Sequence, residues 1–111
     1  MKEGEIFLVS LPEDERTGTE IKKDRPCIII KNFIGYGLVF PVAISRGEKR
    51  FLEPLNVPLI RTAENGLIED SVAVTYQAFS VSKDRLIKRL GELDKESFDI
   101  VKETLRRRLN L

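Results

Sequence analysis

Short apolar stretches separated by polar turns dominate the first eighty residues of the chain. Residues 4–11, GEIFLVSL, place alternate apolar side chains on two faces and begin at a glycine, which predicts a first strand. Residues 25–32, RPCIIIKN, carry four consecutive apolar residues, a pattern typical of a strand buried on both faces. Residues 37–45, GLVFPVAIS, predict a third strand, which the chain enters through a GYG turn.

Prolines and polar residues set the boundaries of these strands. Pro26 cannot donate a ladder hydrogen bond, so we expect it at the start or edge of its strand. Prolines at positions 54 and 58 confine residues 51–60 to a sheet edge or to irregular structure. Residues 71–79, SVAVTYQAF, predict one further strand. Residues 12–24 are polar and too numerous for a tight turn, and long loops in small domains are often functional.

The spacing of apolar residues changes to three and four after residue 80. Ser82 is expected to cap a short helix over residues 83–90 that ends at Gly91. Asp94 is expected to cap a longer helix over residues 95–109. The apolar face of that helix would consist of Phe98, Val101, Leu105 and Leu109. About five strands and a C-terminal helix predict a mainly β fold, with a curved sheet or partly open barrel covered by the last helix.

Composition narrows the class of protein. With 111 residues and no apolar run near the roughly 20 that span a membrane, the chain is expected to form one soluble domain over residues 1–111. The sequence begins with a strand pattern rather than a signal peptide, so we expect a cytoplasmic protein. Cys27 is the only cysteine, which excludes an internal disulfide and a cysteine-rich zinc site. Its PCIII context favours a buried thiol over a reactive one.

The absence of histidine limits the chemistry further. No histidine-based acid–base pair, triad or zinc site is possible, so reactions near neutral pH must use carboxylates, Lys, Arg, Tyr or hydroxyls. We expect no metal and no cofactor. The net charge of +1 is strongly segregated: residues 1–20 carry two basic and six acidic side chains, whereas residues 21–50 carry seven basic and two acidic ones. A cationic middle segment indicates either an anionic ligand such as a nucleic-acid backbone or a solvated face.

Several short motifs occur in an order and spacing that resemble one family. They are GEIFLVSL, GTE followed by RP (Gly18, Thr19, Glu20, Arg25, Pro26), IIIKN, a strand with VFP, GLIEDSVAVTYQ, and VSKDRLIKRLGEL. Together these motifs make the chain similar to the MazF/PemK family of toxin endoribonucleases over most of its length, with residues 46–65 matching poorly.

The resemblance implies a fold, a reaction and partners. It implies a small SH3-like barrel with a terminal helix that acts as a symmetric homodimer. Members of the family cut single-stranded RNA at short sequences without a metal. They are held in check by an antitoxin protein whose flexible acidic segment lies in the RNA groove. No membrane is involved.

The resemblance also assigns catalytic residues. Arg25 occupies the position of the family's catalytic arginine, and a guanidinium suits a phosphorane because it can donate two parallel hydrogen bonds. Glu20 matches a loop glutamate of the family and is the candidate base, with a solvated acid as the alternative. The family has a threonine two residues after the strand proline, where this chain has Ala43. Ser45 is the nearest hydroxyl, but it would lie about 7 Å further along the strand.

Further residues are candidates for RNA contacts. They are Lys22, Lys23, Asn32, Arg46, Lys49, Arg50 and Gln77. Each basic residue of this set has plain surface charge as its alternative, and only the cluster is informative. Tyr36 lies between two glycines and would either stack on an exposed base or cover the turn. Phe79, where many relatives carry an arginine, is expected in the core rather than on a base.

Three functions follow from these residues. The first is a MazF-like endoribonuclease toxin that uses Arg25 and Glu20, with Ser45 as a stand-in for the missing threonine. The second is a catalytically impaired module that binds RNA or an antitoxin peptide in the same groove, which Ala43 favours. The third is inhibition of a protein such as DNA gyrase, as in the related CcdB-type toxins.

Overall fold

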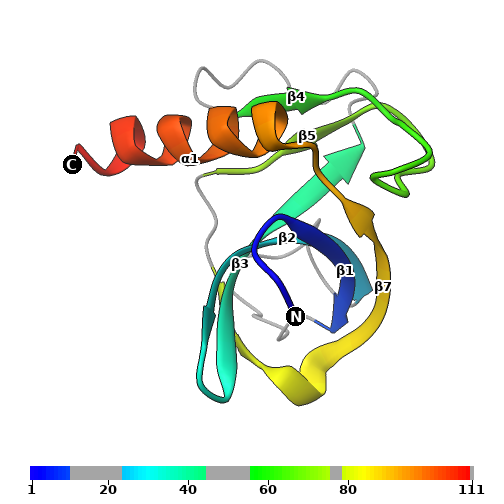
Figure 1. The fold of residues 1–111 in the computed structure, drawn as a ribbon, viewed down its shortest axis with the longest axis vertical. Coiled ribbons are helices and arrows are strands. Elements are labelled where there is room, and N and C mark those ends of the chain that lie inside the picture. The colour runs from blue at the N-terminus through cyan, green and yellow to red at the C-terminus, as the bar shows by residue number, and fades with distance from the viewer. Residues whose placement is uncertain (11–23, 45–55, 76–78, 111) are drawn as a thin grey trace, which may run out of the picture.

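The computed structural model describes residues 1–10, 24–44, 56–75 and 79–110, and it is mainly β with one C-terminal helix (Figure 1). The N-terminal strands are β1 (Glu5–Ser10), β2 (Asp24–Phe33) and β3 (Tyr36–Ile44). They are followed by β4 (Val57–Leu59), β5 (Ser71–Ala73), β6 (Phe79–Ser82), the 3-10 helix η2 (Lys83–Arg85), β7 (Leu86–Glu92) and α1 (Lys95–Leu109).

The strands pair in the order β4-β5-β3-β2-β1-β7, and every pairing is antiparallel. Strand β3 is shared: its first half pairs with β2 and β6, and its second half pairs with β5. Figure 1 shows β1, β2, β3 and β7 curling around one another, while α1 lies beside β4 and β5. In the part of the chain that the structure describes, the ladder ends at β4 and β7 and does not close.

Strand β2 has the burial that its sequence predicts. All four apolar residues of Cys27–Ile30 are buried. Strand β2 is a central strand between β1 and β3, and apolar clusters cover both of its faces. Pro26 pairs with Leu8 of β1 and lies one position beyond the last β2–β3 pair, Cys27 with Pro41. No described β2–β3 hydrogen bond therefore depends on its missing N–H, which confirms the expected place of Pro26 near the start of the strand.

Alternation along β1 and β2 divides the core into two clusters. One lies between the sheet and α1 and contains Ile6, Ile28, Ile30, Val57, Leu59, Leu67, Ala73, Leu93 and Val101. The other lies inside the curved strands and contains Val9, Cys27, Ile29 and Val81, with Met1, Phe7 and Leu86 packed against it. The four buried β2 side chains, Cys27–Ile30, thus alternate between the two clusters.

Helix α1 begins and ends as expected. The Asp94 carboxylate accepts hydrogen bonds from the N–H of Ser97 at 3.0 Å and from its hydroxyl at 2.7 Å, and these bonds lower the pKa of Asp94. The helix ends at Asn110, whose φ of 59° is the left-handed conformation of a C-cap. Val101 is buried, but Leu109 is 58% exposed, so the predicted apolar face does not reach the last turn.

The helix predicted over residues 83–90 is wrong. Only Lys83–Arg85 form a turn of 3-10 helix, and Leu86–Glu92 continue as β7. The spacing of Leu86 and Leu90 suited a helix, but β7 pairs with β1 and the gain from this pairing exceeds local helix propensity. Gly91 does not cap a helix; it is buried within β7, against the backbone of residues 64 and 65.

The strand predicted over residues 71–79 is two strands. Ser71–Ala73 pair with both β3 and β4, whereas Phe79–Ser82 pair with a different part of β3. The expectation for residues 51–60 is confirmed for the described part, because β4 is an edge strand in which Pro58 is exposed. None of the described helices is long and apolar enough to cross a membrane.

Candidate functional site

Arg25 is the second residue of β2 and lies opposite Val9 of β1. Its side chain is half-buried, between the exposed Asp24 and the fully buried Cys27. By strand alternation it shares the face of Cys27 and Ile29, which belong to the inner core cluster. The local sequence therefore places a guanidinium at the margin of an apolar core, where a partly dehydrated cation interacts strongly with an anion.

Ala43 of β3 lies beyond the described pairing of β3 with β2. The last described β2–β3 pair is Cys27 with Pro41, and Val42–Ile44 pair with β5 instead. A hydroxyl at position 43 beside Arg25 therefore stays a prediction.

The β3–β5 pairing tests whether a bulge could bring Ser45 to position 43, where it would replace the missing threonine. Val42, Ala43 and Ile44 pair with Ala73, Val72 and Ser71 in an unbroken register. A bulge that moves Ser45 toward the position of the missing threonine is therefore not found within Val42–Ile44. Ser45 itself lies outside the described residues.

Cys27 is close to Arg25 but is not a nucleophile. Its Sγ donates to the carbonyl oxygen of Arg25 at 3.5 Å. Burial raises the pKa of the Cys27 thiol to about 12, and the charge of Arg25 offsets only part of this rise. The thiol stays protonated near neutral pH, which confirms the prediction of a buried core thiol.

Arg85 is a second cation at this end of the sheet. The sequence patterns do not identify it as a candidate. Its Nη1 donates to the carbonyl oxygen of Ser10 at 3.2 Å, and Ser10 pairs with Asp24, next to Arg25. The sequence pattern assigned Arg85 to a helix, which hid its position. The η2 turn before β7 brings it to the end of β1. No local sequence signal predicts this position, because it depends on the pairing of β7 with β1.

Asn32 lies far from Arg25. The two residues are seven positions apart on the same strand, so about 23 Å of extended chain separates them. The side-chain amide of Asn32 donates to the carbonyl oxygen of Met1 at 2.7 Å. The structure therefore does not bring these two candidates together. The other candidates, Glu20, Lys22, Lys23, Ser45, Arg46, Lys49, Arg50 and Gln77, lie outside the described residues.

A buried polar network holds the C-terminal end of α1 to the sheet. Arg108 Nε donates to the hydroxyl of Thr75 at 3.0 Å, and the N–H of Thr75 donates to Oδ1 of Asn56 at 3.0 Å. Thr75 and Asn56 are both buried. Of the three C-terminal arginines, Arg108 is thus a structural anchor, while Arg106 pairs with Glu103 on the helix surface at 2.8 Å.

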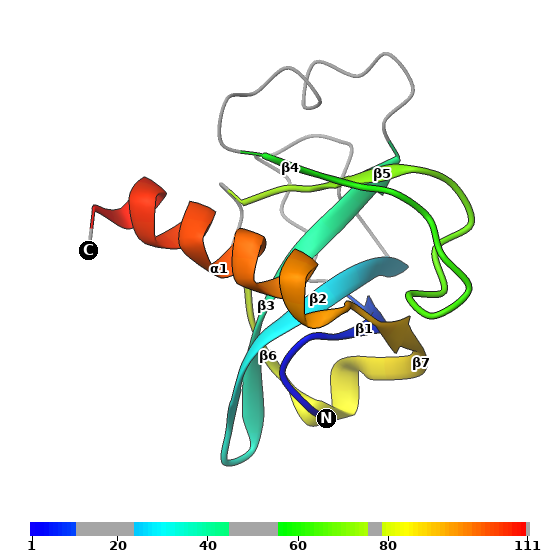
Figure 2. The ribbon, with the colours of Figure 1, turned by 45° about the horizontal axis from the view of Figure 1, so that its top comes forward.

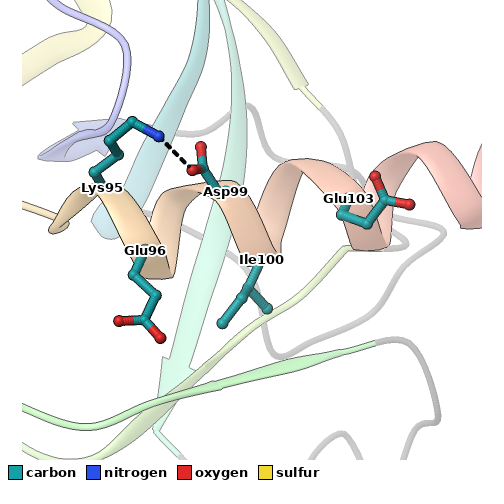
Figure 3. Close-up of a pocket in the computed structure, with 5 residues that line it drawn as sticks. All are labelled: Lys95, Glu96, Asp99, Ile100 and Glu103. Carbon is teal, nitrogen blue, oxygen red and sulfur yellow. Dashed lines mark hydrogen bonds and ion pairs between the residues drawn. The ribbon is translucent and has the colours of Figure 1, made fainter.

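Two hollows flank these elements. One, of about 540 Å³, lies on the outer face of α1, where Lys95 pairs with Asp99 at 2.8 Å and Ile100 projects between the acidic side chains (Figure 3). Its lining includes Glu96, Asp99 and Glu103, which repel phosphate. The other, of about 430 Å³, lies on the face of β1 and β2 opposite to Arg25. It is lined by Leu8, Pro26, Gly66, Leu67, Ile68, Glu69, Ser71, Lys88 and Leu90.

These features define a class of protein: a small antiparallel β fold with one covering helix and arginines at the ends of its strands, suited to an anionic ligand. Residues 2–109 match the family described as PemK-like, MazF-like toxin of type II toxin–antitoxin system. The chain therefore belongs to this toxin family. No curated protein matches the sequence closely.

Solved structures share the fold at low sequence identity. MazF from Deinococcus radiodurans has a TM-score of 0.77 and 18% identity, with 100% of this chain and 97% of that chain covered. The Mycobacterium tuberculosis toxin MazF-mt6 has a TM-score of 0.70 and 20% identity, covering 96% and 97%. An endoribonuclease in complex with its cognate antitoxin from a mycobacterial species has a TM-score of 0.70 and 18% identity, covering 98% and 94%.

Proposed function

We propose that the protein is the toxin of a toxin–antitoxin pair and acts as a metal-independent endoribonuclease that cuts single-stranded RNA at short sequences. The observation that carries this proposal is the placement of Arg25, the residue at the family's catalytic position. It lies half-buried at the start of β2, on the face of the inner core. The family match over residues 2–109 supplies the context.

The reaction would be attack of a ribose 2′-hydroxyl on the adjacent phosphorus. The 2′-oxygen forms a bond to phosphorus, the bond to the 5′-oxygen breaks, and a 2′,3′-cyclic phosphate remains on the upstream fragment. Arg25 stabilises the charge on the phosphorane oxygens, since a guanidinium stays protonated at neutral pH. We assign Glu20 as the base that takes the 2′-hydroxyl proton, and Ser45 as the hydroxyl that assists. A proton from water or Arg25 reaches the departing 5′-oxygen.

The alternative is a catalytically impaired module that binds RNA or an antitoxin peptide. The unbroken register through Val42–Ile44 favours it, because position 43 carries an alanine in place of the threonine that the resemblance implies and no bulge in this stretch brings Ser45 nearer. The two functions share the same surface and differ only in whether the bond to the 5′-oxygen breaks.

The remaining parts of the proposal concern assembly. We propose that the curved strands β1, β2, β3, β6 and β7 form an SH3-like barrel and that two copies form a symmetric dimer. The partner is an antitoxin protein that covers the RNA groove, and the site of action is the cytoplasm. Support comes from the solved structures that share the fold, one of which is described in complex with its cognate antitoxin.

The experiment is incubation of purified protein with a long single-stranded RNA in EDTA, followed by mapping of both new ends. The proposal expects cuts at one short recurring sequence and a cyclic phosphate, or its hydrolysed form, on the upstream fragments. Loss of cutting upon chelation would contradict the metal-independent mechanism. Binding without any cut would favour the impaired module.

A further inference from the structure

The hairpin between β2 and β3 ends in an exposed aromatic pair. Phe33 and Tyr36 lie opposite each other, with ring centroids 5.0 Å apart and ring planes at 24°. They remain 42% and 44% exposed, and Ile34 between them is 99% exposed. We call Phe33–Tyr36 the hairpin tip. Figure 2 shows that it projects away from α1, beyond the rest of the sheet.

The hairpin tip is held in place by its neighbours. Gly35 has a φ of +87°, the left-handed conformation that suits glycine in a tight turn. The N–H of Lys83 donates to the carbonyl oxygen of Gly35 at 3.3 Å, and the side chain of Asn32 donates to Met1. The stacked rings are therefore preorganised, and a ligand would not have to order them.

Cations accompany the rings. Lys31 precedes the tip, and its ion pair with Glu3 at 3.8 Å is solvent-exposed and weak. Lys83 is exposed and forms no ion pair with a residue that the structure describes. The nearby Asp84 accepts a hydrogen bond from the hydroxyl of Ser82. Aromatic faces beside lysines are the combination that binds single-stranded nucleic acid, because bases stack and phosphates pair with the cations.

We propose that the hairpin tip is a second contact for single-stranded nucleic acid, at which Phe33 and Tyr36 stack on a base and Lys31 and Lys83 meet its phosphates. The tip is eight residues along β2 from Arg25, or about 26 Å of extended strand. A chain held at Arg25 therefore reaches it only with nucleotides well outside the cleaved bond. The inference rests on the proposed function, since it gives that RNA substrate a flanking contact.

The test uses single-stranded DNA, which lacks the 2′-hydroxyl and is not cut by the proposed mechanism. Binding of a fluorescein-labelled, mixed-sequence strand of about 16 nucleotides, the upper end of single-strand site sizes, is measured by anisotropy. The double variant Phe33→Leu/Tyr36→Leu keeps apolar side chains but removes both rings. We expect its affinity to fall at least about fivefold, the lower end of what losing a stacked base costs.

Ile34→Ser is the matched control at the same tip. It should bind within about twofold of the parent, and both variants should unfold at the parent's melting temperature. Unchanged binding by the double variant, or no binding by the parent, would overturn the inference. If Ile34→Ser lost as much affinity for the strand as the double variant, the hairpin tip would be a general apolar contact, as for a protein. That result would also overturn the inference. Cutting of long RNA by the parent is scored separately, so the proposed function can stand if this inference falls.

Discussion

At the scale of single residues, the proposed reaction depends on Arg25 of β2 and on position 43 of β3. Arg25 has the charge that a phosphorane needs, and Ala43 lies two residues beyond the last described β2–β3 pair, Cys27 with Pro41. Ala43 stands where the resemblance implies a threonine hydroxyl that assists the arginine, so the chain has no hydroxyl at this position.

Ala43→Thr should therefore raise the rate of RNA cleavage. Thr favours strands, so the change should be tolerated. A hydrogen bond made only in the transition state contributes on the order of 2 to 3 kcal/mol, or roughly a thirty- to hundredfold gain. Single-turnover rates are to be compared for the parent, Ala43→Thr, Ser45→Ala and the double variant. If Ser45 already supplies the hydroxyl, Ala43→Thr gains nothing and Ser45→Ala abolishes cutting. No cutting by any of the four would reject the nuclease.

A second residue-scale prediction concerns Glu5 and pH. Burial alone would raise the pKa of Glu5. The net pKa is nevertheless lowered, because the carboxylate accepts hydrogen bonds from Arg89 Nε at 2.5 Å and from the N–H of Lys2, and because it lies beside the Arg89 charge. The stability from Glu5 is thus present above its unfolded pKa and lost as pH falls through the lower folded value. At pH 7 the free energy of unfolding of Glu5→Gln should be about 1 to 2 kcal/mol lower than that of the parent. A larger loss is not expected, because Arg89 is half-exposed and solvent screens its charge.

Urea unfolding at pH 7 and at successively lower pH below 4.5 measures this difference. The gap between parent and Glu5→Gln should narrow as the pH falls, because protonated Glu5 no longer accepts both hydrogen bonds as an anion. A gap that stays constant across this range would show that the Glu5–Arg89 pair does not carry the pH dependence.

At the scale of elements, β7 depends on a close approach of backbone. A Cβ on Gly91 would lie 2.4 Å from the carbonyl oxygen of Glu64, and the N–H of Glu92 donates to that same oxygen at 2.9 Å. Gly91→Ala should lower the free energy of unfolding by about 3 kcal/mol, the upper end of what overpacking costs.

Gly35→Ala is the comparison for Gly91→Ala. Its Cβ would meet nothing within 4 Å, so only the left-handed backbone opposes it, at about 1 to 2 kcal/mol. Urea unfolding of both variants shows which substitution lowers the free energy of unfolding more, and we expect it to be Gly91→Ala. If Gly91→Ala proved the more stable of the two, residues 64 and 65 would not be packed against β7 as described.

The elements also show how far the sequence predicts this fold. Local signals sufficed for β1, β2 and α1, because an apolar run at Cys27–Ile30 and a cap at Asp94 act within a few residues. They failed at Leu86–Glu92, since the partner of this strand, β1, is some eighty residues away in the chain. Arg25 could be identified as a candidate from a motif, whereas Arg85 could not, because its place depends on that same long-range pairing.

At the scale of the whole molecule, we predict a homodimer at micromolar concentration. A chain of 111 residues offers little surface for a deep groove, and an isologous pair would build one between copies. Several large apolar side chains remain exposed for such an interface, among them Ile60 at 75% and Leu109 at 58%. Sedimentation velocity measures the mass directly. A monomer at this concentration would count against the shared groove and against the proposed site.

The central claim is that Arg25 stabilises the transition state of a metal-independent RNA cut. The most direct test is the single-turnover cleavage rate of long single-stranded RNA in EDTA by the parent, Arg25→Ala and the surface control Arg106→Ala. We predict that Arg25→Ala, with an unchanged melting temperature, cuts at least about a hundredfold more slowly, since removing one transition-state donor costs on that order. Arg106→Ala should cut at the parent's rate. Equal rates for the parent and a folded Arg25→Ala would contradict the account.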